Sequence, residues 1–89
     1  MIEIAFSSSF ERAFERKIAG NIEREKLFRA KLEVFQNNPF EAKLKTHKLS
    51  GKLKDYWSFS VEYDLRIIFY FSEKEKVVFI DVGTHKEVY

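Results

Sequence analysis

The first third of the chain has the apolar spacing of one short strand and then a helix. Ile2 to Phe6 alternates apolar and polar side chains, which predicts a strand. Among the serines that follow, Ser8 stands three residues before Glu11, the spacing of a capping box at a helix start. The predicted helix places apolar residues on one face: Phe10, Ala13, Phe14 and Ile18. Gly20 stands where a glycine commonly ends a helix.

A second stretch of helical spacing follows almost at once. Asn21 is suited to cap this helix, and Asn37-Asn38-Pro39 is suited to end it. Its apolar stripe is formed by Leu27, Phe28, Leu32, Val34 and Phe35. Because the joint at Gly20-Asn21 is so short, we expect an antiparallel helical hairpin whose two apolar stripes face one common layer.

The second half of the chain alternates apolar and polar positions in three runs, which predicts three strands near 57–62, 65–71 and 76–82. The first two runs put their apolar sets on one face only if an odd number of residues forms the loop, so we expect the loop Glu62-Tyr63-Asp64. This register places Ser60 opposite Arg66 on the less apolar face.

In the last run, strict alternation would put Val78, Ile80 and Val82 on one side and Val77, Phe79 and Asp81 on the other.

These elements predict an α+β fold of the order β-α-α-β-β-β, with the helical hairpin packed on one face of an antiparallel-dominated sheet. The other face is expected to be partly open. Residues 39–55 have only a weak pattern and are interpreted as a basic, irregular connection. At 89 residues the chain is expected to form one domain over residues 1–89.

Composition narrows the class of protein. The chain is 45% hydrophobic and 34% charged, which is typical of a globular domain. It has no cysteine, so neither a disulfide framework nor a thiolate metal site is available, and we expect a cytoplasmic protein. No segment approaches the roughly 20 apolar residues that span a bilayer, so no membrane association is expected.

The excess positive charge is confined to one segment. The net charge is +2, and residues 43–54 contain five lysines and no acid. His47 lies within this segment and Tyr56 and Trp57 follow it, so cations and stackable rings occur together. This predicts a polyanion as partner, with Lys45, Lys48, Lys52 and Lys54 as nucleic-acid contacts. A solvated lysine-rich loop is the alternative.

The candidate chemistry is acid–base catalysis on this basic surface. No glycine-rich phosphate loop, zinc-type cluster or nucleophile elbow is present, and no cofactor or metal is expected. RNA cleavage needs a base, an acid and a cation, which His47, His85, Asp64 and Arg66 could supply. The alternatives are two incidental surface histidines, a turn residue at Asp64, and an ion pair of Arg66 with Glu62 or Asp64.

Three segments together resemble the RelE/ParE toxin superfamily: HKLSGKLKDYWS at 47–58, VEYDLRIIF at 61–69 and GTH at 83–85. The strand and helical hairpin ahead of them extend the likeness to nearly the whole chain and imply a RelE-like fold. The Gly-Thr-His ending and the histidine before Leu-x-Gly are most similar to the YafQ-like branch, whose members are ribosome-dependent messenger RNA endonucleases.

The resemblance implies a role for each matching residue. His47 and Asp64 match a catalytic histidine and aspartate, His85 matches the histidine usually assigned as general acid, and Tyr89 matches a C-terminal aromatic. Arg66 matches the phosphate-stabilising arginine of YoeB and RelE relatives.

Two positions depart from the pattern of this branch. Ser60 stands where YafQ has a further histidine, and Leu65 stands where it has tryptophan. The division of acid and base roles therefore stays open.

The resemblance further implies a toxin of a type II toxin–antitoxin system, an endoribonuclease that cuts messenger RNA in the ribosome. Its partners would be a cognate antitoxin, in a hetero-oligomeric complex, together with messenger RNA and the ribosome. Two alternatives are a ParE-like inhibitor of DNA gyrase and a non-catalytic nucleic-acid-binding module that uses the basic segment and Trp57. The combination of His47, Asp64 and His85 favours the nuclease.

Overall fold

The computed structural model describes residues 1–84 and 86. The elements in chain order are β1 (Glu3–Phe6), α1 (Ser8–Lys17), α2 (Ile22–Asn37), the short 3-10 helix η1 (Ala42–Leu44), β2 (His47–Lys48), a second 3-10 helix η2 (Gly51–Leu53), β3 (Trp57–Glu62), β4 (Leu65–Glu73) and β5 (Lys76–Gly83).

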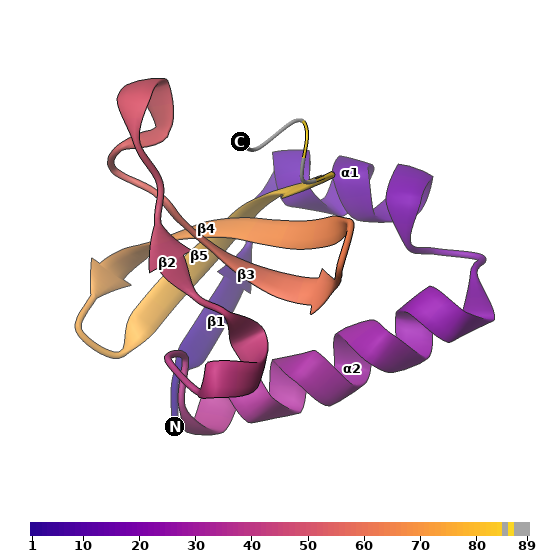
Figure 1. Ribbon diagram of the computed structural model, residues 1–89, viewed down its shortest axis with the longest axis horizontal. Coiled ribbons are helices and arrows are strands. Elements are labelled where there is room, and N and C mark those ends of the chain that lie inside the picture. The colour runs from indigo at the N-terminus through magenta and orange to yellow at the C-terminus, as the bar shows by residue number, and fades with distance from the viewer. Residues whose placement is uncertain (85, 87–89) are drawn as a thin grey trace.

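One five-stranded sheet contains every strand of the described residues, in the order β1-β5-β4-β3-β2 (Figure 1). β1 runs parallel to β5, and every other neighbouring pair is antiparallel. The predicted α+β fold with an antiparallel-dominated sheet is confirmed. β2 is a strand that the sequence does not predict. It lies within the basic connection, and its two residues are too few to show an alternation.

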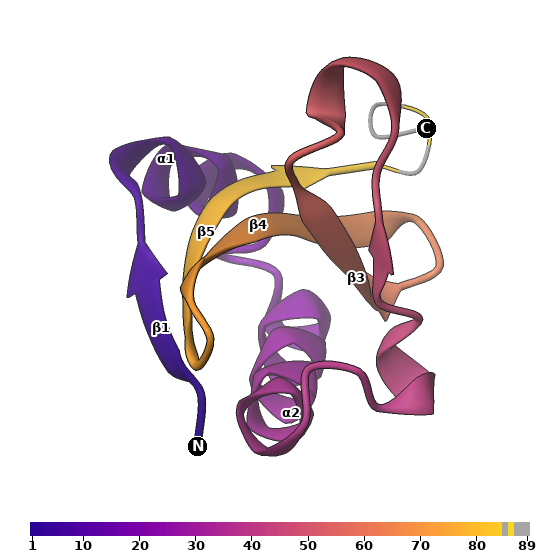
Figure 2. The same cartoon turned by 90° about the vertical axis from the view of Figure 1, so that its left-hand side faces the viewer.

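Both helices contribute to one core on the same face of the sheet. Their side chains join those of the strands in a single apolar cluster, in which the Phe14 and Phe28 rings link the two helices with centroids 5.2 Å apart. The helices diverge from the turn at Gly20, so that α1 lies along β5 and α2 reaches toward β3 (Figures 1 and 2). Neither helix, within the part of the chain that the structure describes, is long and apolar enough to cross a membrane.

Polar side chains cap the N-termini of both helices, and one of the two caps differs from the predicted residue. Ser7, and not Ser8, caps α1, because its hydroxyl oxygen accepts the Phe10 N–H at 3.1 Å. Asn21 caps α2 as predicted and accepts the Arg24 N–H at 3.1 Å. Gly20 has a φ of +85°, a left-handed conformation that glycine adopts without a steric cost.

Arg24 fastens the helical turn to the sheet. Its Nη1 donates to the Lys17 carbonyl oxygen at 2.8 Å, and its Nε donates to the Glu62 carboxylate at 3.0 Å. The end of α1, the start of α2 and the end of β3 are thus joined by one guanidinium.

The parallel edge of the sheet carries a second charged contact. The Lys76 ammonium lies 3.0 Å from the Glu73 carboxylate and 3.6 Å from that of Glu3 on β1. The hydrogen bond to Glu73 and the charge of Glu3 raise the pKa of Lys76.

The register of the β3–β4 hairpin confirms the predicted pairing of Ser60 with Arg66. The loop differs in detail: Glu62 pairs with Leu65, so the turn has two residues and a bulge precedes it in β3. The shorter turn and the extra residue of the bulge compensate each other. The apolar residues of β3 and β4 therefore lie on one face, as predicted.

A second bulge makes the strict alternation predicted for the last strand wrong. Ile68 pairs with Asp81 and Phe69 with Phe79, which leaves Ile80 as the extra residue. Beyond it the faces exchange, so Val82 joins Phe79 in the helix-side core while Asp81 faces the other way.

The centre of the core is Phe35 of α2, which is fully buried. Its ring centroid lies 4.8 Å from that of Phe59, 5.0 Å from that of Phe69 and 5.5 Å from that of Phe79. One side chain therefore holds α2 against the three inner strands.

We predict that Phe35→Ala lowers the free energy of unfolding by about 3–5 kcal/mol, because it removes a fully buried ring and leaves a cavity among three other rings. Urea denaturation followed by circular dichroism measures this loss. Ile22→Ala is the control: Ile22 is a helix residue that is 70% exposed, and its replacement should change stability by less than about 0.5 kcal/mol. Equal effects of the two substitutions would contradict this account of the core.

Candidate active site

The sheet face turned away from the helices, here called the outer face, carries the candidate residues in rows across the strands. In the first row, β4 places Arg66 between Ser60 of β3 and Gly83 of β5. Directly paired residues of antiparallel strands lie on the same face, so these three residues share the outer face.

The second row contains His47. His47 pairs with Ser58, Ser58 with Ile68, and Ile68 with Asp81, which gives a continuous row across β2, β3, β4 and β5. Ile68 is two residues from Arg66 on β4, so the two rows are adjacent. Ideal sheet spacings place the Cα atoms of His47 and Arg66 about 12 Å apart, close enough for both side chains to touch one phosphodiester group.

Arg66 is held at the sheet surface with only 7% of its area exposed. Its Nη2 lies 3.5 Å from the Tyr63 carbonyl oxygen, at the outer limit for a hydrogen bond, so the guanidinium is directed toward the β3–β4 turn. A cation with so little water around it interacts more strongly with an anion than a fully hydrated one. Its planar group can donate two parallel hydrogen bonds to a phosphate.

Asp64 lies in that same turn. It is exposed and stands two residues before Arg66, between the ends of β3 and β4. The structure thus places Asp64 and Arg66 at one end of the hairpin.

His47 is exposed on the edge strand β2, and its ring is oriented by the backbone. Nδ1 lies 2.9 Å from the Lys45 carbonyl oxygen. Because a carbonyl oxygen can only accept, Nδ1 carries the hydrogen of this bond and Nε2 is the proton-accepting nitrogen of the neutral ring. Lys45 has a φ of +52°, and this left-handed turn directs its carbonyl group back toward the ring.

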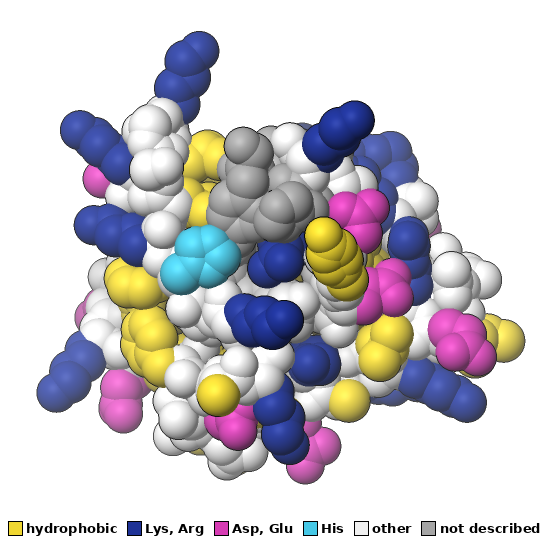
Figure 3. Space-filling view, in the orientation of Figure 1, with side chains coloured by type: hydrophobic (Ala, Val, Ile, Leu, Met, Phe, Trp, Pro, Cys, Tyr) yellow, Lys and Arg dark blue, Asp and Glu magenta, His cyan; other side chains and the backbone are white. Residues whose placement is uncertain are grey.

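The four lysines of the predicted nucleic-acid contact are all exposed but do not form one strip: Lys45, Lys48, Lys52 and Lys54. Lys48 pairs with Trp57, so alternation directs it to the opposite side of β2 from His47. Lys52 lies in η2, and the connection around it projects beyond the sheet (Figures 1 and 2). Figure 3 shows lysine and arginine side chains around a histidine on this side of the molecule.

Trp57 is not on the outer face, although its place after the basic segment suggested a stacking surface. Its ring packs on the helix side, 5.4 Å from the Phe40 ring and 5.9 Å from the Phe71 ring between centroids. Of the two stackable rings that the sequence indicated, Tyr56 does lie on the outer face, and beside it lies the ring of Tyr70, which sequence reasoning did not assign. The sequence signal for Tyr70 is the alternation of faces along a strand. Tyr70 is four residues from Arg66 and therefore on the same side of β4.

The outer face is less open than the sequence suggested. Leu49 and Ile68 form a small buried cluster on it, against which Leu53, Tyr56 and Ile80 pack. The connection between β2 and β3 therefore covers part of the sheet with its own apolar residues.

The other two predicted residues, His85 and Tyr89, lie outside the described residues. The strand that leads toward them, β5, ends at Gly83, directly opposite Arg66. Within residues 1–84 and 86, no group of three or more histidine, aspartate or glutamate side chains is arranged to hold a metal ion.

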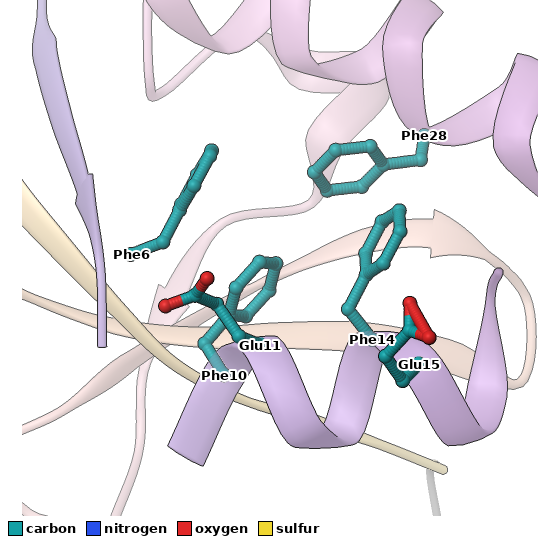
Figure 4. A pocket seen from close by; sticks show the side chains of 6 residues that line it. All are labelled: Phe6, Phe10, Glu11, Phe14, Glu15 and Phe28. Carbon is teal, nitrogen blue, oxygen red and sulfur yellow. The ribbon is translucent and has the colours of Figure 1, made fainter. Parts of the chain in front are cut away.

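A cavity of about 450 Å³ lies on the helix side, away from these residues. Four phenylalanine rings and two carboxylates line it: Phe6, Phe10, Phe14, Phe28, Glu11 and Glu15 (Figure 4). None of these side chains donates a hydrogen bond, and the two carboxylates repel anions. This cavity is therefore unsuited to bind a phosphate, and the outer face remains the candidate active site.

Solved structures share this fold. The chain resembles a chain of the DinJ–YafQ complex from Escherichia coli with a TM-score of 0.68 and 23% identity, over 100% of this chain and 99% of that one. It resembles a YoeB/ParE toxin from Agrobacterium tumefaciens with a TM-score of 0.75 and 16% identity, over 94% and 99% of the two chains. For the YoeB–YefM complex from Staphylococcus aureus, the TM-score is 0.73 and the identity 19%, over 96% and 98%.

The sequence comparison is more specific than the fold. Among curated proteins none matches the chain. The family model described as a bacterial toxin of type II toxin–antitoxin system, YafQ, matches residues 2–89. A match of that extent includes both helices and all five strands, and it shows that the chain belongs to the YafQ family of type II toxin–antitoxin toxins.

Proposed function

We propose that this toxin is a ribosome-dependent messenger RNA endoribonuclease. The observation that carries the proposal is the placement of Arg66 and His47 in adjacent rows of one sheet face, with Asp64 at the nearby turn. A phosphate-binding cation and groups that can transfer protons are thereby available to one RNA strand. Membership of the YafQ toxin family supports the same function.

The proposed reaction uses the RNA's own 2′-hydroxyl as nucleophile. A base takes the 2′-hydroxyl proton as the oxygen forms a bond to the adjacent phosphorus. The bond from phosphorus to the 5′-oxygen breaks, and an acid donates a proton to that leaving oxygen. The products are a 2′,3′-cyclic phosphate on one fragment and a free 5′-hydroxyl on the other.

Arg66 would stabilise the negative charge that accumulates on the phosphate in the transition state. Its limited exposure supports this role, because electrostatic stabilisation is strongest where little water competes.

His47 or Asp64 would take the 2′-hydroxyl proton. The Lys45 carbonyl oxygen holds His47 in the tautomer whose Nε2 accepts a proton, which is the form that a general base requires. His85 is proposed as the general acid and Tyr89 as a further residue of the site, both from the family resemblance.

The basic segment would position the RNA. Lys45, Lys48, Lys52 and Lys54 are exposed and can neutralise backbone phosphates, with Lys48 on the opposite side of β2 from His47. Such contacts carry little sequence information, so the lysines would hold the RNA strand that the ribosome presents without selecting its sequence.

A small antitoxin is the proposed protein partner, in a hetero-oligomeric complex in the cytoplasm. Relatives with this fold have been solved as the DinJ–YafQ and YoeB–YefM complexes. An extended or helical antitoxin segment that masks basic surface would prevent RNA from reaching the outer face.

Substitutions in the candidate active site should slow cleavage. In a translating extract, the wild-type protein should produce new transcript ends with 2′,3′-cyclic phosphates, which end mapping detects. His47→Ala and His85→Ala should each lower the cleavage rate by about 100-fold or more, the usual size of a proton-transfer contribution. Arg66→Lys should also slow cleavage, because a point charge replaces the planar donor group.

Arg12→Ala is the matched control, because Arg12 is an exposed cation of α1 and lies outside the candidate site. This variant should cut like wild type. A His85→Ala protein that cuts as fast as wild type would refute the acid assignment. Inhibition of gyrase supercoiling without any RNA cleavage would instead establish the ParE-like alternative.

The tautomer of His47 can be observed directly. Nitrogen NMR at a pH where the ring is neutral should show hydrogen on Nδ1 and a proton-accepting Nε2, because the Lys45 carbonyl oxygen accepts from Nδ1. His47→Gln assigns the signal by removing it. Hydrogen on Nε2 of the neutral ring would exclude His47 as the base in the proposed orientation.

The proposed antitoxin should bind the toxin and stop cleavage. Co-expression with the product of the neighbouring gene should yield a complex that co-elutes in size-exclusion chromatography and no longer cuts transcripts. The free toxin, recovered from the complex by denaturation and refolding, should regain cleavage. A stable complex that cuts at the full rate would contradict masking of the RNA-binding surface.

A further inference from the structure

The third row of the outer face carries two tyrosines. Ser58 pairs with Ile68 and Trp57 with Phe69, so the next step of this antiparallel register sets Tyr56 opposite Tyr70. Their ring centroids lie 6.1 Å apart with the planes at 63°. The backbone fixes this position, because the Tyr56 carbonyl oxygen accepts the Leu49 N–H at 2.9 Å.

A cavity of about 350 Å³ opens beside these rings. Its lining consists of Asp55, Tyr56, Tyr70 and Phe71, and we call it the tyrosine pocket. Both tyrosines are half-buried, and Asp55 is exposed. The pocket thus combines aromatic surfaces with a carboxylate that can accept hydrogen bonds.

The inner side of the tyrosine pair has a structural role. Tyr56 packs on the buried cluster of Leu49 and Ile68 and helps to cover the sheet. That packing accounts for the buried part of the ring. It does not account for the open cavity on the other side of the pair or for the carboxylate that lines it.

The distance from the candidate active site suits a strand of RNA. Tyr70 is four residues from Arg66 along β4, which corresponds to about 13 Å. A nucleic acid strand advances about 3.4 Å per nucleotide when its bases are stacked, and more when it is extended. A strand whose phosphate is held by Arg66 therefore reaches the tyrosine pocket within about four nucleotides.

We propose that the tyrosine pocket binds one base of the RNA strand that is cut at Arg66. The inference rests on the proposed function for the identity of this ligand. Stacking on Tyr70 or Tyr56 holds the base, as aromatic side chains commonly do in single-strand recognition. Lys52 and Lys54, which precede Asp55 in the chain, hold the neighbouring phosphates.

Asp55 gives the pocket a preference among bases. Its carboxylate accepts hydrogen bonds from an exocyclic amine, which adenine, cytosine and guanine carry. Uracil carries no amine and offers only its N3–H, which lies between two carbonyl oxygens that repel the carboxylate. The pocket therefore disfavours uracil at its position relative to the cut.

Binding of short oligonucleotides that cannot be cut tests the pocket apart from cleavage. The probes are 2′-O-methyl hexanucleotides of adenine, cytosine or uracil, and the ring signals of Tyr56 and Tyr70 in NMR titrations report binding at this position. The adenine probe should bind wild type about fivefold more tightly than the uracil probe. Asp55→Asn should reduce that difference to less than twofold.

The variants separate stacking from packing. Tyr70→Leu keeps apolar volume on the sheet but removes the ring, and it should weaken binding of the adenine probe about tenfold. Tyr70→Phe keeps the ring and should bind within twofold of wild type. Phe6→Leu is the matched control, because Phe6 is an aromatic residue that is 48% exposed and lines the helix-side cavity; it should bind like wild type.

Equal binding by wild type, Tyr70→Leu and Phe6→Leu would overturn the proposal, as would probe signals that map away from the two tyrosines. If the wild type binds no probe in solution, the base composition around cut sites in a translating extract tests the proposal instead. Tyr70→Leu must then change it at one fixed position, and an unchanged profile overturns the proposal.

The same data distinguish failure of the proposed endoribonuclease from failure of the proposed base pocket. Probe binding at Tyr70 without any transcript cleavage would contradict the proposed endoribonuclease and support the pocket. Cleavage with no dependence on Tyr70 would contradict the pocket and support the endoribonuclease.

Discussion

The pairing register of β4 with its neighbours is the constraint on which the rest of the structure depends. Leu65, Ile67 and Phe69 are buried against the helices, and Arg66, Ile68 and Tyr70 alternate with them on the outer face. A slip of one residue would turn the guanidinium into the core and the phenylalanine ring out of it. A charged guanidinium among apolar side chains is strongly unfavourable, so the apolar core favours the register that keeps Arg66 on the outer face.

This arrangement gives the two faces of the same strands different roles: one face forms the core, and the other carries the residues of the proposed active site. The helix face is almost entirely apolar and contains the rings around Phe35. The outer face carries the arginine, the histidine row and the tyrosine pair at intervals of two residues. Because those intervals are properties of the β-pleat, the spacing between the proposed phosphate site and the tyrosine pocket is as rigid as the sheet.

The main elements and the β3–β4 register could be predicted from the sequence, because long runs of alternating or helical spacing have a clear period. The bulge at Ile80 could not, because an extra residue interrupts the alternation without any local signal such as glycine. β2 is too short to show a period. The side of the sheet taken by Trp57 depends on its partners Phe40 and Phe71, which only the tertiary structure brings together.

The central claim is that Arg66 and His47 act on the same phosphate, and a double-mutant cycle on cleavage rates tests it most directly. His47→Ala and Arg66→Lys would be measured singly and together in a translating extract. Groups that act on one transition state are not independent, so the double variant should be little slower than the slower single variant. A double variant whose rate falls by the product of the two single effects would contradict the account.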